Sequence, residues 1–215
     1  MARGFFITFE GTEGTGKSTQ AALLGEALRR EGKKAVVTRE PGGTGLGEEL
    51  RRILLGDGFE ELDPTAELFI YMADRAQHVA QVILPALDEG KVVICDRFTD
   101  ATVAYQGEGR GLRREMIESL NAEAALGLVP DLTILLDFED VAEGLGRAAE
   151  RNRRAGKSGS GDRFEREEVD FHRRVQQGYR SLAKTDPARY RSLAANLALE
   201  DLHAQIMALV REALA

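Results

Sequence analysis

Residues 11 to 18 read Gly-Thr-Glu-Gly-Thr-Gly-Lys-Ser, and they directly follow the apolar run Phe5–Phe9, which has the character of a β-strand. In such a loop the glycines let successive backbone N–H groups turn inward around a β-phosphate, and the lysine reaches the β and γ oxygens. Leu24, Ala27 and Leu28 then follow at helical spacing, so the loop opens a helix whose N-terminal dipole also favours an anion. The order of strand, loop and helix predicts a phosphate-binding P-loop with a nucleoside triphosphate as its ligand.

The polar groups of this loop have distinct expected roles. Lys17 should contact the phosphate that is transferred, and the Ser18 hydroxyl can ligate Mg²⁺. A glycine-rich turn that matches the pattern by chance is the alternative, and the flanking strand and helix argue against it. We therefore expect the triphosphate to be held by Gly11, Thr12, Glu13, Gly14, Thr15, Gly16, Lys17, Ser18 and Thr19.

Length, charge and cysteine content limit the class of protein. A chain of 215 residues without an internal repeat or an evident linker predicts one well-buried domain over residues 1–215. Lys and Arg number 29 against 36 Asp and Glu, and the net charge of −7 argues against a nucleic-acid surface as the main function. The single Cys95 excludes an intrachain disulfide, and no signal-like segment or membrane-length apolar stretch is seen. We expect a cytoplasmic protein without a membrane or nucleic-acid partner.

Strand-like and helix-like patterns alternate along the chain, which is typical of a mainly parallel α/β sheet. Together with the loop, this alternation predicts a P-loop NTPase fold with three α/β/α layers and a five-stranded parallel sheet. Strands are expected at Phe5–Phe9, Ala35–Thr38, Val92–Cys95, Leu132–Leu136 and near Tyr190–Ala194. Helices are expected at Lys17–Glu31, Gly45–Leu55, Asp63–Asp88, Arg113–Gly127, Val141–Arg153, Phe164–Lys184 and Leu199–Leu214.

Two of the expected helices carry features that bear on the site. In the helix at Asp63–Asp88, Asp63 and Pro64 have the form of an N-cap followed by proline, and Pro85 should kink or end the helix. The helix at Phe164–Lys184 has an apolar stripe, which we interpret as core rather than function. That stripe consists of Phe171, Val175, Tyr179 and Leu182.

A cationic segment at about residues 147–163 breaks the composition, because glycines replace apolar residues in it. In isolation a basic Gly/Ser loop is usually solvated surface. Beside a P-loop, the same segment is better interpreted as a mobile lid that supplies positive charge to a transferred phosphoryl group and excludes water. Its cations are Arg147, Arg151, Arg153, Arg154, Lys157 and Arg163.

Further polar residues stand at the ends of the expected strands, where ligands gather in open parallel sheets. Asp96 and Arg97 follow the strand Val92–Cys95. Asp96 is placed to hold Mg²⁺ through water, and the forked guanidinium of Arg97 can clamp a second phosphate. A structural ion pair at the strand end is the alternative interpretation of this dipeptide.

With these motifs the chain resembles the thymidylate kinases, and the resemblance runs from about Phe5 to the C-terminus. Beyond the P-loop, four ordered motifs match that family in sequence and spacing. They are Thr38-Arg39-Glu40-Pro41-Gly42-Gly43-Thr44 with Gly47-Glu48-Glu49-Leu50-Arg51, then Ala73-Asp74-Arg75-Ala76-Gln77-His78, then Asp96-Arg97-Phe98 with Ala104-Tyr105-Gln106-Gly107, and Asp162-Arg163-Phe164-Glu165. The resemblance implies transfer of the γ-phosphate of ATP to dTMP, with Mg²⁺ as cofactor.

The resemblance also implies a role for individual residues toward dTMP. Arg51 and Arg97 would hold the acceptor monophosphate, Tyr71 would stack on the base, and Arg75 would donate to the thymine O4. Without the motif around it, Tyr71 would be interpreted as a core aromatic residue. The remaining implied contacts are Thr102 and Gln106 at the base edge, Tyr105 against the sugar, and Glu13 as acceptor for the 3′-hydroxyl.

The P-loop also indicates a subtype, because it contains no arginine. In the bacterial type of the family the cation that assists transfer comes from the lid, and Arg151 and Arg147 align best with that role. With Lys17 and Arg97 these arginines make up the expected catalytic set. The family further implies a homodimer packed through long helices such as Asp63–Asp88, although the apolar stripes could equally be buried within one subunit.

Two other functions compete with this interpretation. One is a P-loop kinase for a different nucleoside monophosphate, which the base-contacting residues Arg75, Thr102 and Tyr105 would distinguish. The other is a nucleotide-dependent switch, in which hydrolysis drives a conformational change without a phosphoryl acceptor. The sequence has no Asn-Lys-x-Asp guanine motif, and a switch has no use for a second phosphate clamp.

Overall fold

One parallel sheet forms the centre of the molecule. The computed structural model describes residues 3–56, 58–59, 62–156 and 161–215. Within them, five strands pair in the order β2-β3-β1-β4-β5, and every pairing is parallel. The expected parallel α/β fold is thus confirmed. The strands are β1 (Phe5–Glu10), β2 (Ala35–Arg39), β3 (Val92–Asp96), β4 (Leu132–Asp137) and β5 (Tyr190–Ala194).

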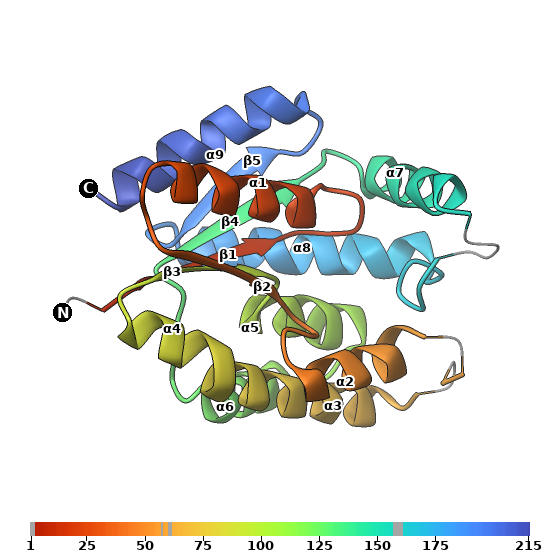
Figure 1. The fold of residues 1–215 in the computed structure, drawn as a ribbon. Helices are drawn as coiled ribbons and strands as arrows, with labels where there is room; N and C mark the ends of the chain where they lie inside the picture. Colours follow the sequence, from red (N-terminus) through yellow and green to blue (C-terminus); the bar gives the residue numbers. More distant parts are fainter. Residues whose placement is uncertain (1–2, 57, 60–61, 157–160) are drawn as a thin grey trace.

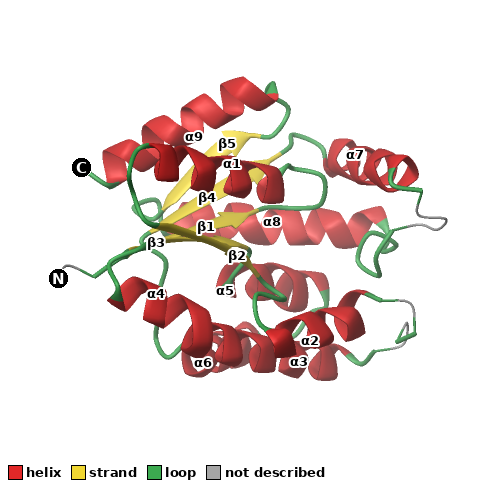
Figure 2. Ribbon diagram, viewed as in Figure 1, coloured by secondary structure: helices red, strands yellow, loops and turns green. Residues whose placement is uncertain are grey.

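Helices cover both faces of this sheet (Figure 1, Figure 2). The α-helices are α1 (Lys17–Arg30), α2 (Gly45–Leu55), α3 (Pro64–His78), α4 (Leu84–Asp88), α5 (Thr99–Thr102), α6 (Arg114–Ala124), α7 (Val141–Arg154), α8 (Val169–Thr185) and α9 (Leu199–Ala213). Two π-helical segments, η1 (Val79–Ile83) and η2 (Val103–Gly109), join them. Helices α1 and α9 lie on one face, and α3, α4, α6 and α8 lie on the other (Figure 1). None of the helices described here combines the length and apolarity needed to cross a bilayer.

The three central strands, β1, β3 and β4, are almost continuously apolar because both of their faces are buried. Ile7 and Phe9 of β1 belong to the core beneath α1 and α9, whereas Phe6 points to the opposite core, formed with η1 and α4. This alternation follows the two-residue period of a strand. Burial of both faces of β1 holds the strand in place. The end of the strand, where the loop with the polar motif begins, is therefore held in place as well.

The helical run after Asp63 does not end at Pro85 but continues to Asp88, where the expected helix also ends. Asp63 caps α3 as predicted, by accepting from the backbone N–H groups of Thr65 and Ala66. The chain then forms the π-helical η1, and α4 carries Pro85 in its first turn and ends at Asp88. A proline ring removes one N–H donor and crowds the preceding turn, and the wider π turn before it accommodates the ring.

The segment 147–163 differs from the expected loop. The helix expected at Val141–Arg153 is confirmed as α7, which ends at Arg154, so the first part of the segment is helical, with Ala148 and Asn152 buried. Lys157 lies outside the described residues. After the segment, α8 begins at Val169 rather than at Phe164, because the Asp162 carboxylate accepts from the N–H groups of Phe164 and Glu165 and forms a separate turn. The helical structure over Thr99–Gly109 was not predicted, because that stretch lacks an apolar stripe at helical spacing.

Helix α7 packs directly on the P-loop through two glycines. A Cβ atom added to Gly144 would lie 2.3 Å from the carbonyl oxygen of Glu13, and one added to Gly14 would lie 2.0 Å from the carbonyl oxygen of Gly144. Neither contact leaves space for a methyl group. The base of the lid helix therefore fixes the backbone of the phosphate-binding loop.

This contact predicts opposite effects of the same substitution at two positions of α7. Gly146 has open space around it, so Gly146→Ala should stabilise the protein by about 1 kcal/mol through helix propensity. Gly144→Ala should instead destabilise it by about 1–3 kcal/mol, because the methyl group meets the carbonyl oxygen of Glu13. Thermal unfolding of both variants checks the pair. Equal shifts of Tm would contradict the packing described here.

Candidate active site

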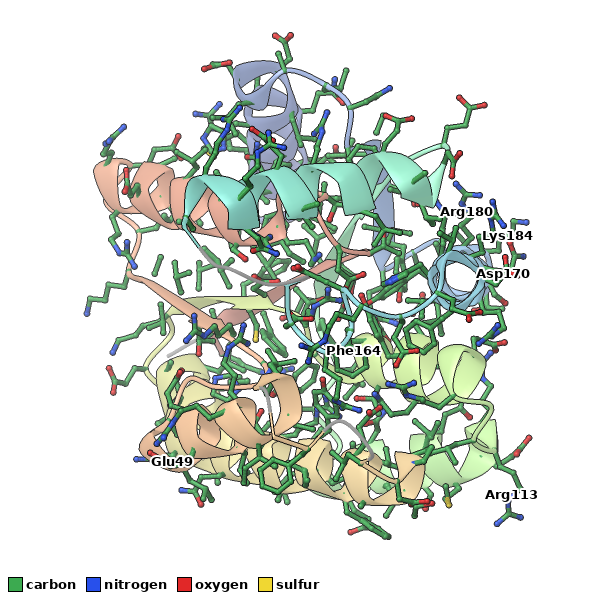
Figure 3. All side chains as sticks on the ribbon, turned by 90° about the vertical axis from the view of Figure 1, so that its right-hand side faces the viewer. Glu49, Arg113, Phe164, Asp170, Arg180 and Lys184 are labelled. Atoms are coloured by element: carbon green, nitrogen blue, oxygen red, sulfur yellow. The ribbon has the colours of Figure 1, made fainter. Side chains whose placement is uncertain are left out.

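The carboxyl ends of the central strands open onto one cleft of about 720 Å³. The loop that joins β1 to α1, which contributes to the lining, lies at the right-hand edge of the sheet in Figure 1. Figure 3 faces this edge and shows Phe164 between α7 above and α2 and α3 below. Of the residues expected to contact nucleotides, the lining includes Glu13, Gly14, Lys17, Ser18, Arg51, Tyr71, Arg75, Asp96, Arg97, Thr102, Tyr105, Gln106 and Arg151.

Lys17 is held within its own loop. Its Nζ donates to the carbonyl oxygen of Thr12 at 2.7 Å and to Oγ1 of Thr15 at 3.2 Å. Burial, and then the positive charge of Arg97, lower the pKa of Lys17 to about 8. A bound triphosphate would oppose this shift, because an adjacent anion favours the charged ammonium. The loop is thus arranged to take a highly charged anion.

Ser18 and Asp96 are brought together although they are far apart in the sequence. The Ser18 hydroxyl donates to Oδ2 of Asp96, and both residues line the cleft. Oδ1 of Asp96 is buried and has no hydrogen-bond partner among the described residues. Hydroxyl and carboxylate oxygens suit Mg²⁺, which proteins usually bind through one or two carboxylates together with substrate phosphates. The donor set therefore fits this metal.

Arg97 occupies the centre of a polar cluster at the end of β3. Its backbone has φ 72°, a left-handed conformation that is uncommon for a residue other than glycine. The guanidinium donates to the carbonyl oxygen of Gly11 at 3.0 Å and to the hydroxyls of Tyr179 at 3.1 Å and Tyr105 at 3.0 Å. It also contacts Oε1 of Glu13 at 3.2 Å. Such strained backbone is typical of functional sites.

Glu13 is an ionised acceptor inside the P-loop. Burial alone would raise the pKa of its carboxyl group, but the contacts with His172, Arg97 and Lys17 outweigh burial and lower the pKa to about 2. The hydroxyl of Tyr105 donates to Oε1 of the same carboxylate. A carboxylate in this state can accept a hydroxyl hydrogen from a ligand in the cleft.

Arg51 provides a second cation in the same cleft. Its Nη1 donates to the carbonyl oxygen of Pro41 at 2.9 Å, which directs the guanidinium from α2 toward the lining. Burial, and then Arg39, lower the pKa of Arg51, as expected for a cation that has no anionic ligand. The ring of Tyr71 lines the cleft from α3.

Arg75 is 1% exposed and is fully engaged within the protein. Its Nε donates to Glu40 at 2.9 Å, and Nη1 donates to Thr102 at 3.0 Å and to Asn121 at 2.6 Å. Nη2 donates to the carbonyl oxygen of Phe98 at 3.1 Å. Each guanidinium nitrogen thus has a protein partner, and a contact to a base oxygen would add to or displace one of these bonds. The structure does bring Arg75 and Thr102 together, as their shared role requires.

Glu67 of α3 joins Gln106 to the end of the lid. It is 0% exposed, and its carboxylate accepts from Nε2 of Gln106 at 2.7 Å and from Arg110 at 3.3 Å. Arg163 also donates to it and to the carbonyl oxygen of Leu54. Arg163 is therefore a buried structural cation, which corrects its assignment to the mobile cationic segment.

The structure separates the two lid arginines expected to assist transfer. Arg151 lines the cleft, is 60% exposed and pairs with Glu165. Arg147 lies outside the cleft, where it donates to the carbonyl oxygen of Ala195 at 3.0 Å and covers the ring of Phe138 at 4.9 Å. Of these two arginines, only Arg151 is placed to meet a phosphate.

Several residues that support the site were not predicted from the sequence. Tyr179 was assigned to the apolar stripe of α8, yet its hydroxyl accepts from Arg97 and donates to Glu10 at 2.7 Å. The ring does belong to the core, as expected. A tyrosine on an otherwise apolar face was the available signal, since a buried phenol needs a partner. Asn121 and Glu67 gave no comparable signal.

Comparisons with known proteins agree with this geometry. The family model for thymidylate kinase matches residues 9–206. The chain belongs to the thymidylate kinase family. It is 57% identical over 185 residues to the thymidylate kinase of Solidesulfovibrio magneticus, covering 86% of this chain and 88% of that protein. It is 52% identical over 212 residues to the thymidylate kinase of Pelotomaculum thermopropionicum, covering 99% and 95% of the two chains.

A solved structure supports the same family at the level of fold. The crystal structure of thymidylate kinase from Ehrlichia chaffeensis superposes with a TM-score of 0.77 at 32% identity, covering 97% of this chain and 99% of that one. The identification with the thymidylate kinase family that the motifs indicated is therefore confirmed over nearly the whole chain.

The buried position of Glu67 predicts a large loss of stability when its charge is removed. Glu67→Gln leaves the buried Arg163 without its carboxylate, whereas Arg110 keeps Glu167, and breaking a buried pair costs about 3–5 kcal/mol. Glu150→Gln is the matched control, because Glu150 pairs with exposed arginines and should change stability by less than about 0.5 kcal/mol. Urea unfolding measures both. Similar midpoints for the two variants would show that the Glu67 cluster does not stabilise the fold.

Proposed function

We propose that this protein transfers the γ-phosphate of ATP to dTMP, giving ADP and dTDP. The observation that carries the proposal is that a P-loop and the arginines Arg51 and Arg97 line one cleft. The enzyme therefore has two phosphate sites facing each other, as a kinase with a nucleotide acceptor requires. A nucleotide-dependent switch would need only the first site.

At the acceptor end, Arg51 and Arg97 hold the monophosphate of dTMP by bidentate contacts. The ring of Tyr71 stacks on the thymine. Arg75, Thr102 and Gln106 read its edge, and all three line the cleft. Tyr105 lies against the sugar, where it restricts a 2′-hydroxyl, and Glu13 accepts the 3′-hydroxyl. Charge and position support each of these roles.

At the donor end, the loop from Gly11 to Thr19 surrounds the phosphates of ATP. The ammonium group of Lys17 stays in contact with the γ-phosphate while it is transferred. Ser18 and Asp96 would hold Mg²⁺, with Oδ1 of Asp96 as the open oxygen. When bound, the metal neutralises charge on the β- and γ-phosphates. The protein side chains place the two nucleotides in line, and positioning contributes most of the catalysis.

In the transfer step, an oxygen of the dTMP phosphate forms a bond to the γ-phosphorus. The bond from that phosphorus to the β–γ bridging oxygen breaks, and ADP leaves. Lys17, Arg97 and Arg151 stabilise the charge on the oxygens of the transferred group. We assign this role to Arg151 rather than to Arg147, because Arg151 lines the cleft. To contact the phosphate, Arg151 has to break only its ion pair with Glu165.

We further propose a homodimer that packs through α2 and α3, in the cytoplasm where the nucleotide substrates occur. Phe69 of α3 is 54% exposed and Leu46 of α2 is also exposed, which leaves apolar surface on neighbouring helices. Contact with a second copy would cover it. Sedimentation that shows a monomer at micromolar concentration would contradict the dimer.

The acceptor preference tests the proposed function directly. ADP release with ATP and Mg²⁺ is measured in parallel with dTMP, dUMP, dGMP, dCMP, UMP and no acceptor. We expect release that depends on dTMP, is weaker with dUMP and is negligible without acceptor. Release that is independent of acceptor would favour the switch, and preference for another monophosphate would overturn the roles of Arg75, Thr102 and Tyr105.

The position of Arg151 predicts a selective loss of turnover. Arg151→Ala should lower kcat by a large part of the roughly 10³–10⁵-fold effect that such arginines supply, with little change in the KM for dTMP. Arg154→Ala is the control, because Arg154 is on the same helix but pairs with Glu150 outside the cleft. Steady-state kinetics compare the variants. A kcat within a few-fold of wild type for Arg151→Ala would rule out the assignment.

A further inference from the structure

His172 is a buried residue of α8 that none of the roles above uses. It is 0% exposed and does not line the cleft. Its Nδ1 lies 3.2 Å from Oε2 of Glu13. For this contact to be attractive, Nδ1 must carry its hydrogen and direct it toward the carboxylate. The histidine therefore stands behind Glu13, on the side away from the cleft.

The two oxygens of Glu13 have different surroundings. Oε1 accepts from Tyr105 and contacts Arg97. Oε2 makes no hydrogen bond of normal geometry with any described residue, and neither ring nitrogen of His172 makes one. Glu13 and His172 are thus a pair of buried polar side chains, adjacent to each other and incompletely satisfied.

Such a pair indicates a ligand, because buried polar atoms without partners cost free energy and are rare in native proteins. Glu13 lines the cleft, so a hydroxyl of a bound molecule can donate to its carboxylate. A carboxylate oxygen can accept a second hydrogen from behind. Oε2 is buried 3.2 Å from Nδ1 of His172, so His172 limits the orientation of the carboxylate from the side away from the cleft.

We infer that His172 is a positioning residue that holds Oε2 of Glu13 and so orients the carboxylate to accept the 3′-hydroxyl of the acceptor sugar. This inference rests on the proposed transfer of phosphate to dTMP. It assigns selection for a 3′-hydroxyl to a pair of side chains, of which only Glu13 touches the substrate. The competing explanation is that His172 only fills the core, where its ring packs edge-on against Phe171 at 5.5 Å.

An acceptor without the 3′-hydroxyl separates the two explanations. We compare kcat/KM for dTMP with that for 3′-deoxythymidine monophosphate in wild type, His172→Phe and His172→Asn. His172→Phe keeps a ring but removes both nitrogens, and we expect it to lower the preference for dTMP about tenfold, since hydrogen bonds to charged groups are strong. His172→Asn places an N–H near the position of Nδ1 and should restore much of the preference. Activity on the deoxy acceptor should stay close to wild type in both variants.

The matched control is Val175→Ala, which loosens the same helix without changing a polar group. It should alter both acceptors equally and leave the preference unchanged. Equal loss on the two acceptors in His172→Phe, or the same preference in all variants, would overturn the positioning role. A wild type that does not phosphorylate dTMP would instead overturn the proposed function, and the inference with it.

A second measurement needs no substitution. The chain contains three histidines, so side-chain ¹⁵N resonances can be assigned in the wild-type protein. Saturation with dTMP should shift the ring nitrogens of His172, whereas saturation with 3′-deoxythymidine monophosphate should leave them near their free positions. Identical shifts with both nucleotides would contradict the inference even if His172→Phe fails to fold.

Discussion

The placement of one cation, Arg97, determines much of the site. Its guanidinium is held at the end of β3 by two tyrosine hydroxyls, a backbone carbonyl and the carboxylate of Glu13. A cation at this place lowers the pKa of both Glu13 and Lys17, although burial acts on them in opposite directions. Without a bound phosphate, the loop thus contains an ionised carboxylate, that of Glu13, and an ammonium group, that of Lys17, whose pKa is lowered. The negative charges of a triphosphate and of a second phosphate would compensate the positive charges of Lys17 and Arg97.

Two buried carboxylates hold the polar side chains of the cleft in the same way. Glu40 binds the guanidinium of Arg75, and Glu67 binds the amide of Gln106 together with two arginines. Burying such charges is costly unless they are paired and hydrogen-bonded, so each group is restricted to one arrangement. The site is therefore built in two layers. The inner layer would contact the nucleotides, and the outer layer fixes the rotamers of the inner one.

Sequence analysis predicted what depends on local pattern. The P-loop, the parallel sheet and the residues at strand ends follow from neighbouring residues, and the structure places them as expected. What it missed depends on contacts between distant elements. Nothing near Glu67 in the sequence indicates that Arg163 will reach it. The positions of His172 and Arg147 needed coordinates for the same reason, because only the packing of α8 and α7 places His172 against Glu13 and Arg147 outside the cleft.

The contact between Gly144 and the P-loop has a consequence for how this family can diverge. Because backbone atoms alone make the contact, a larger residue on one side cannot be compensated by a smaller one on the other, where no side chain exists to remove. Gly14 and Gly144 should thus each be invariant. Because neither varies, the pair should show no correlated substitutions. A structural coupling between lid and loop would then be invisible to methods that detect contacts from correlated substitutions.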